Sequence, residues 1–454
     1  MISKWIKNFD NLVTTENRRL ILEIAEAGLE AINTKDVVAS SIKLENNILF
    51  VKDQKFDLNK FKKIKVVGFG KASCEAASAL EAIFGSKINE GAVVDLNKTT
   101  CIYIEMLTGT HPRPSEMNVV AGERIYEIIK DSNEYDLIIV LVSGGGSALL
   151  CYPESEFRQG IKLYDSFLKS GKTITEINTV RKHLSLFKGG GLAKIAFPAT
   201  IIGLVFSDIP GDAFENVASG PTYKDKTTIA DANKIITENN LGEFDLIETP
   251  KEDKYFEKVH NFALISNKTA VEAMAKKAQA FNLGVKIIST ILYDEVDNAL
   301  EKIFLIKNRD SKEFLSGLAG GRTQGTEDPR KSFAGSVFLA AGEPRIAVPK
   351  NGGKGGRNLH MGLSVIKRKL IDKEDFQNSV FISFASDGMD NSDVAGAIVD
   401  KNTIEKAEKL SLDVDDYLNR FDSYNFFKKT GDTIITGFTG ANVSDLMILL
   451  TKND

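Results

Sequence analysis

The amino-acid sequence predicts an α/β protein built from two α/β lobes, of which the N-terminal one is Rossmann-like. Two observations support this prediction. Apolar, strand-like runs alternate with stretches of helical spacing, which implies parallel strands joined by right-handed crossovers. The chain also has 36 glycines, and many of them follow the apolar runs directly. Its length of 454 residues fits two or three domains at roughly 150 residues each.

The charge and composition exclude several classes of protein. Lys and Arg number 58 and Asp and Glu number 62, so the formal net charge is −4 and we expect no nucleic-acid partner. No apolar run approaches the ~18 residues that cross a bilayer, and charges interrupt the N-terminal apolar positions, so we expect neither a membrane partner nor a secretory signal. A cytoplasmic protein is the expectation. Its oligomeric state stays open, with a homodimer as one candidate.

The predicted N-terminal domain covers residues 1–245. It opens with a helix to about Asn33, because apolar residues recur there at every third or fourth position. A buried strand over 65–71 then ends in glycines and leads into an alanine-rich helix over 72–84. Further apolar runs predict strands at Ile48–Val51, Gly91–Leu96, Asp136–Val142 and Ala199–Phe206.

A polar and acidic stretch over 238–258, which contains Pro250, predicts the boundary between the domains. The C-terminal domain is therefore predicted over 258–454. Its strands are predicted at Asn261–Ser266, Val285–Ile291, Ser336–Ala341, Arg345–Val348, Val380–Ala385 and Thr433–Gly437. Loops rich in glycine, serine, threonine and aspartate follow several strands of both domains. Because ligands of open α/β sheets bind beyond the carboxyl ends of the strands, these loops are the candidate sites.

The clearest candidate is the loop Ser143-Gly144-Gly145-Gly146-Ser147, which follows the apolar run LIIVLV. Exposed amide groups and hydroxyl donors in such a loop favour an anion, and glycine lets a ligand approach the backbone closely. The alternative interpretation is a flexible turn.

Lys71 lies in a second glycine turn, GFGKAS, at the start of a predicted helix. The helix dipole repels a lysine there, so contact with an anion held at the same terminus explains the residue better than a solvated side chain does. The turn also resembles the start of a dinucleotide fingerprint, in which Ser73 replaces the third glycine and Asp95 would bind a ribose. Lys71 itself departs from that fingerprint.

Short acidic loops follow strands in both predicted domains. Asp208 and Asp212 lie in SDIPGD, and Asp387 and Asp390 lie in SDGMDN. Because Mg²⁺ takes one or two carboxylates and completes its shell with water and phosphate oxygens, this spacing suits a magnesium site. The alternative is a helix cap or an Asx-turn. The cysteines and histidines fall in no CxxC or HxxxH spacing, so any metal is expected to bind oxygen atoms.

Further charged residues lie near these loops. Arg357 follows two glycines at a predicted helix start. Arg181 adds positive charge between SGGGS and SDIPGD, although it belongs to an amphipathic helix with a solvated outer face. Glu343 would either orient a substrate hydroxyl or pair with Lys354. His111 begins the rigid turn HPRP, which is either structural or the place of an acid–base histidine.

Nine motifs stand in order along nearly the whole chain: GFGKAS, HPRP, LVSGGGSALL, INTVRKHLS, SDIPGD, VASGPT, GKGGRN, SDGMDN and TGFTGANVSDL. Together they resemble the type-II glycerate kinases, a family whose C-terminal half is called the MOFRL domain. The resemblance implies an enzyme that phosphorylates D-glycerate with ATP and Mg²⁺ to give 2-phosphoglycerate, in a cleft between two α/β lobes. It also implies that Lys71 of the GxGKA turn and Arg357 of the GGRN turn are catalytic.

The expected ligands are therefore a nucleotide and glycerate or a similar hydroxy acid. On this hypothesis Lys71 and the 143–147 loop hold anionic oxygens, and Arg357 stabilises charge on the γ-phosphoryl group. Asp208 and Asp387 would hold Mg²⁺ or orient the acceptor hydroxyl. The remaining predicted substrate- or phosphate-binding residues are Arg181 and Glu343.

Some positions depart from the family's motifs. Gly191 stands where an arginine is expected, Pro344 interrupts the expected GGE-T-T, and Leu359 and His360 replace Gln and Glu after GGRN. The acceptor can therefore be a related sugar acid. Two alternatives remain open at this point: an NAD(P)H-dependent hydroxypyruvate reductase, and a non-catalytic binder of small sugar acids.

Overall fold

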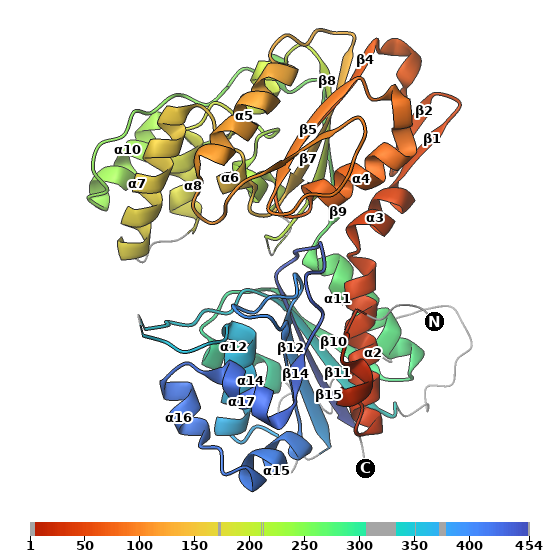
Figure 1. Cartoon of the computed structure of the whole chain (residues 1–454), viewed down its shortest axis with the longest axis vertical. Helices are drawn as coiled ribbons and strands as arrows, with labels where there is room; N and C mark the ends of the chain where they lie inside the picture. The colour runs from red at the N-terminus through yellow and green to blue at the C-terminus, as the bar shows by residue number, and fades with distance from the viewer. Residues whose placement is uncertain are drawn as a thin grey trace, which may run out of the picture. The chain divides into compact units, whose positions relative to one another are not determined.

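The computed structural model describes residues 5–170, 174–209, 211, 213–305, 333–349, 351–371 and 378–452, so Asp212 lies outside the described residues. The chain forms two compact units: unit 1 is Met1–Ile32, Asn267–Thr439 and Ser444–Asp454, and unit 2 is Asn33–Ser266 and Gly440–Val443. Each unit is built around one six-stranded sheet, which confirms the predicted α/β fold class (Figure 1). No helix among the described residues has both the length and the apolar character that a membrane crossing needs.

The sheet of unit 2 has the strand order β6-β5-β4-β7-β8-β9, and all its strands run parallel. In chain order this is the 3-2-1-4-5-6 arrangement of a Rossmann fold, as predicted. Every residue of β7 is buried, as expected for a strand inside a parallel sheet with both faces covered. The strand order reverses between β4 and β7, which places the switch point of the sheet where these two strands end. The strands are β4 (Lys63–Phe69), β5 (Glu90–Asp95), β6 (Glu105–Thr108), β7 (Asp136–Ser143), β8 (Thr200–Phe206) and β9 (Val259–Ile265).

Helices cover the sheet of unit 2, and a small antiparallel sheet of order β1-β2-β3 adjoins α3 and α4 (Figure 1). The main core joins apolar residues of α5 and α9 to β4, β5, β7 and β8. A second apolar cluster joins α7, α8 and α10. The helices are α3 (Thr34–Ser41), α4 (Ser73–Phe84), α5 (Glu116–Ile129), α6 (Gly146–Leu149), α7 (Glu154–Ser170), α8 (Ile174–Lys182), α9 (Gly191–Ala196) and α10 (Ile229–Glu238). The small sheet is β1 (Ile42–Glu45), β2 (Ile48–Val51) and β3 (Gln54–Asp57).

The sheet of unit 1 is mixed, with the order β10-β11-β15-β12-β13-β14. Only β10 and β11 run parallel among these neighbours, and β15 enters antiparallel between β11 and β12. Strands β13 and β15 were not among the predicted strands, and the prediction of a strand over 345–348 was wrong, because Arg345 makes only an isolated bridge with Glu295. The strands are β10 (Gly284–Leu292), β11 (Gly335–Gly342), β12 (Ser379–Ala385), β13 (Gly396–Val399), β14 (Thr433–Ile434) and β15 (Asp445–Lys452).

The helices of unit 1 enclose a core with many aromatic residues, among them Phe381, Phe426 and Phe427, all buried. The long N-terminal helix α2 packs against α11. The helices are α1 (Phe9–Leu12), α2 (Glu16–Ala31), α11 (Asn267–Ala280), α12 (Val296–Leu305), α14 (Arg357–Lys367), α15 (Lys401–Lys409), α16 (Val414–Asn419) and α17 (Ser423–Thr430).

The two units differ from the predicted domains 1–245 and 258–454 in three respects, one of which is that Gly440–Val443 belongs to unit 2. Helix α2 belongs to unit 1, where the buried Arg18 pairs with Asp400 at 2.6 Å and with Asp432 at 2.8 Å. Strand β9 completes the sheet of unit 2 although it follows residue 258. An apolar run predicts a strand but does not show which sheet that strand joins.

Candidate active site

The ends of β4 and β7 form one hydrogen-bonded structure at the switch point of unit 2. The Lys71 amide donates to the Gly144 carbonyl at 2.9 Å, and the Ala72 amide donates to Ser143 Oγ at 3.1 Å. Gly70 has a φ of +116°, and a side chain there would overlap Ser143, so only glycine fits this close approach. The two predicted glycine loops therefore belong to a single site.

Each glycine of the SGGGS loop leaves room for a different neighbour. A Cβ at Gly144 would overlap the Asp208 side chain. A Cβ at Gly145, whose φ is +78°, would lie 3.2 Å from the His111 ring and 3.3 Å from Lys71 Cγ. Lys71, His111 and Asp208 therefore gather around the loop. The amides of Gly145 and Gly146 donate to no acceptor in the described part of the chain.

The two serines of the loop have different surroundings. Ser143 is buried, and its hydroxyl bonds the Ala72 amide and approaches the Phe69 carbonyl at 3.4 Å, so it joins the two loops. This structural function replaces the predicted one of a hydroxyl presented to a ligand. Ser147 is only half-buried, and its hydroxyl lies 2.8 Å from Ser219 Oγ.

A chain of hydrogen bonds links Ser147 to Arg181. Ser219 Oγ donates to Asn178 Oδ1 at 3.3 Å, and Arg181 Nη1 donates to the same oxygen at 2.9 Å. The structure thereby brings Arg181 to the loop, whereas the adjacent Lys182 is buried against Asp225. Asn178 and Ser219 were not predicted as site residues, and their only signal in the sequence is their place in the motifs INTVRKHLS and VASGPT.

The electrostatics of this cluster favour an anion. Partial burial, Lys71 and Arg181 together lower the pKa of His111 to about 4, so its imidazole is neutral at physiological pH. Burial also lowers the pKa of Arg181, while Glu156 opposes that effect. Lys71, Arg181, the neutral imidazole and the backbone amides suit a carboxylate or a phosphate group, and the Asp208 carboxylate beside Gly144 offsets part of this positive charge.

Asp95 and the start of α4 are occupied within the fold. Asp95 is buried, and its carboxylate accepts from the amides of Cys74 at 3.1 Å and Leu96 at 2.6 Å. Burial raises the pKa of Asp95 to about 6. The Ser73 amide donates to the Gly70 carbonyl at 3.1 Å. The acid and the helix amides that a dinucleotide fingerprint would offer to a cofactor are therefore already engaged.

The second predicted cation, Arg357, is the first residue of α14 in unit 1. Asp390 caps this helix by accepting from the amides of Gly356 at 3.2 Å, Asn358 at 3.1 Å and Leu359 at 2.8 Å. Of the two interpretations of the acidic loop, Asp390 therefore takes that of a helix cap. It caps a helix that precedes it in the chain.

Two further carboxylates contact the Arg357 guanidinium. Its Nε donates to Asp445 Oδ2, and its Nη2 lies 3.3 Å from Glu343 Oε1. Glu343 therefore pairs with Arg357, while Lys354 pairs with Asp393. Burial opposes the charge of Arg357, but Asp445 and Glu343 outweigh it and raise the pKa of the guanidinium. Asp445 was not among the predicted site residues.

The two predicted metal ligands lie in different units. Asp208 follows β8 in unit 2, and Asp387 follows β12 in unit 1, where it accepts from the Met389 amide at 3.0 Å. Within the described ranges, no group of three or more His, Cys, Asp or Glu residues could hold a metal ion. A Mg²⁺ ion bound by either aspartate would therefore need water or phosphate oxygens to complete its shell.

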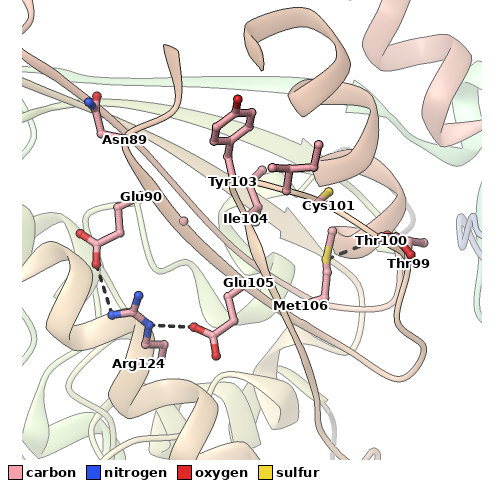
Figure 2. Close-up of a pocket in the computed structure, with 12 residues that line it drawn as sticks. Asn89, Glu90, Thr99, Thr100, Cys101, Tyr103, Ile104, Glu105, Met106 and Arg124 are labelled. Carbon is pink, nitrogen blue, oxygen red and sulfur yellow. Dashed lines mark hydrogen bonds and ion pairs between the residues drawn. The ribbon is translucent and has the colours of Figure 1, made fainter. Parts of the chain in front are cut away.

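A pocket of about 460 Å³ lies elsewhere in unit 2, beside the edge strand β6 (Figure 2). Figure 2 shows Arg124 of α5 between Glu90 and Glu105, to which it pairs at 3.2 Å and 2.9 Å. None of the predicted site residues lines this pocket. It is therefore separate from the site at the switch point.

Comparisons with known proteins cover nearly the whole chain. Residues 20–247 match a family described as a domain of unknown function (DUF4147), and residues 336–445 match the MOFRL family. The chain is 34% identical to a glycerate 2-kinase of Pyrococcus horikoshii, over 96% of this chain and 99% of that protein. It is 33% identical to a putative hydroxypyruvate reductase of Agrobacterium vitis, over 85% of this chain and 86% of that protein. The crystal structure of a glycerate kinase from Thermotoga maritima superposes with a TM-score of 0.79 at 31% identity, over 95% of this chain and 99% of that one.

Proposed function

Because this chain belongs to the glycerate 2-kinase family, we propose that it transfers the γ-phosphoryl group of ATP to the 2-hydroxyl of D-glycerate. The glycerate oxygen bonds to the γ-phosphorus, the bond to the bridging oxygen of ADP breaks, and the hydroxyl proton is released. The observation that most supports this proposal is the gathering of Lys71, Arg181 and the SGGGS loop at the switch point of a Rossmann-like sheet. Ligands of such sheets bind at that point.

In unit 2, Lys71, Arg181 and Ser147 are proposed to hold the anionic oxygens of the acceptor carboxylate or the transferred phosphoryl group. The open amides of Gly145 and Gly146 add neutral donors without another charge. The neutral His111 imidazole beside them would accept or donate a hydrogen bond without adding repulsion between cations. Phosphoryl transfer depends mainly on such positioning and charge stabilisation, because the protein forms no covalent bond to the substrate.

In unit 1, Arg357 is proposed to stabilise the charge that develops on the transferred phosphoryl group. Glu343 lies half-exposed beside this arginine and is proposed to bind the substrate together with it. Asp208 and Asp387 are proposed to hold Mg²⁺, which would neutralise phosphate charge when bound. A cytoplasmic location and a homodimer stay predictions of the sequence.

Substitution of the two cations tests this assignment. Lys71→Ala and Arg357→Ala should each lower kcat by roughly a hundredfold or more, because each removes a charged donor from the developing charge. Lys130→Ala and Arg158→Ala are matched controls, since both side chains are exposed and pair with a glutamate of α5 and of α7, respectively. Nearly normal kinetics in both site variants would refute the assignment.

The hydroxypyruvate reductase alternative has support in the names of some relatives. It is disfavoured because Asp95 and the first amides of α4 are engaged inside the protein. An assay of hydroxypyruvate with NADH, run beside glycerate with ATP, separates the two activities. Oxidation of NADH without any consumption of ATP would favour the reductase.

A further inference from the structure

Arg357 occupies an electrostatically unfavourable position. It is the first residue of α14, where the helix dipole and the unpaired amides repel a positive charge. Asp390 neutralises the helix end, since its two oxygens accept from three of the first amides. The guanidinium itself therefore needs a separate partner to fix its direction.

Asp445 is placed to be that partner. It is the first residue of β15, where it is paired in register with Gly342 of β11 and with Ala385 of β12, so its backbone is held on both sides. The residue is only 3% exposed, and its two oxygens have different donors. Oδ2 accepts from Arg357 Nε, and Oδ1 accepts from Asn358 Nδ2 at 2.9 Å.

Asn358 fixes the orientation of the Asp445 carboxylate. Its Nδ2 also donates to Asp390 Oδ1 at 3.1 Å, and its Oδ1 accepts from Ser383 Oγ at 2.6 Å. Asn358 is 1% exposed, so water does not compete for these bonds. A continuous hydrogen-bond network therefore runs from Ser383 of β12 through the buried Asn358 and Asp445 to Arg357.

The other two nitrogens of the Arg357 guanidinium, Nη1 and Nη2, are not bound by Asp445. A guanidinium has five N–H donors, of which Asp445 takes the one at Nε. Nη2 has the half-exposed Glu343 at 3.3 Å, whereas Nη1 makes no hydrogen bond within the described ranges. The arginine side chain is 34% exposed, so part of it is accessible to an anionic ligand, and Nη1 is the nitrogen without a hydrogen bond among the described residues.

We infer that Asp445 is a positioning residue: it holds the Nε edge of Arg357, so that the Nη1 edge points at the oxygens of the transferred phosphoryl group. The identity of that anion rests on the proposed kinase function, whereas the positioning of the arginine does not. Asp445 itself touches no substrate and acts only through Arg357.

The first test is spectroscopic and independent of activity. A guanidinium Nε–H in a buried bond to a carboxylate exchanges slowly with water, so nitrogen-15 NMR of the whole chain should show a protected Nε–H resonance that Arg357→Lys removes. Asp445→Asn should abolish its protection, whereas the matched control Asp416→Asn, on an exposed pair with Arg420, should not. Unchanged protection in Asp445→Asn would overturn the inference. If that variant does not fold, Asp445→Glu takes its place with the same expected loss.

The second test is a double-mutant cycle on kcat with glycerate and ATP. Asp445→Asn should lower kcat at least about tenfold with a KM for glycerate that changes less than about twofold, and it should cause no further loss in an Arg357→Ala background. Guanidinium ion should restore part of the activity of Arg357→Ala but not of the double variant. Equal losses in both backgrounds would indicate a merely structural function and overturn the inference. A wild-type protein without kinase activity would refute the proposed function, and the NMR test would still decide the positioning.

Discussion

Replacing Gly144 by alanine tests whether Asp208 has to stay beside the glycine loop. The new methyl group would lie 2.8 Å from Asp208 Cβ and closer still to its carboxylate. Ordinary van der Waals contact begins near 3.4 Å, and because Cβ itself is in conflict, rotation of the side chain alone does not relieve the overlap. The carboxylate therefore has to move by about 1 Å or more, a misplacement that typically costs about a hundredfold in rate. We expect kcat of Gly144→Ala to fall by about that factor.

The assay is coupled ADP release at saturating glycerate and ATP, with Mg²⁺ in excess. Gly160→Ala on α7 is the matched control, because a Cβ there meets no atom within 4 Å. It should keep full activity and gain roughly 0.5–1 kcal/mol of stability from the higher helix propensity of alanine. If Gly144→Ala keeps full kcat, the position of the Asp208 carboxylate beside Gly144 does not matter for turnover, and the proposed function of Asp208 is refuted.

Three further predictions concern stability and binding. Burial raises the folded-state pKa of Asp95 to about 6, above the ordinary value of 3.8. The folded protein therefore becomes less stable as pH rises from about 4 to 6, because the buried carboxyl ionises less readily than it does in the unfolded chain. In urea unfolding, the free energy of unfolding of Asp95→Asn relative to that of the wild type should therefore increase by up to about 3 kcal/mol from pH 4 to pH 7. A difference that does not change with pH would contradict this. Arg18→Met leaves the buried Asp400 without its arginine and Asp432 with Lys406 alone, and it should cost about 3–5 kcal/mol in the same experiment; a loss below about 1 kcal/mol would be inconsistent. Ser147→Ala should raise KM for glycerate about tenfold with little change in kcat, and unchanged kinetics would argue against its contact with substrate.

Much of the site in unit 2 was predictable because it depends on local pattern and one topological rule. The apolar runs before Lys71 and Ser143 predicted parallel strands, and ligands of such sheets bind beyond the carboxyl ends of the strands. The structure joins these loops by the bond from the Lys71 amide to Gly144. The alternation of strands and helices predicted a Rossmann-like lobe, whereas the order of its strands is known only from the structure.

The rest depended on contacts between residues far apart in the chain. Arg18 finds Asp400 and Asp432 at separations of 382 and 414 residues, which no periodicity in the sequence indicates, so the N-terminal helix was assigned to the other domain. Asp445 was missed because its strand inserts antiparallel between two others, and only this pairing brings it to Arg357. For Asp390, the sequence left a metal ligand and a helix cap both open, and the choice depended on the fold around α14.

Phosphorus-31 NMR of the protein mixed with D-glycerate, ATP and MgCl₂ examines the proposed chemistry most directly. A phosphate ester on the second carbon couples to the single proton of that carbon and gives a doublet. We predict that this doublet grows as the γ-phosphate signal of ATP disappears. A triplet, from esterification of the CH₂ carbon, or an ATP signal that stays constant throughout, would contradict the account.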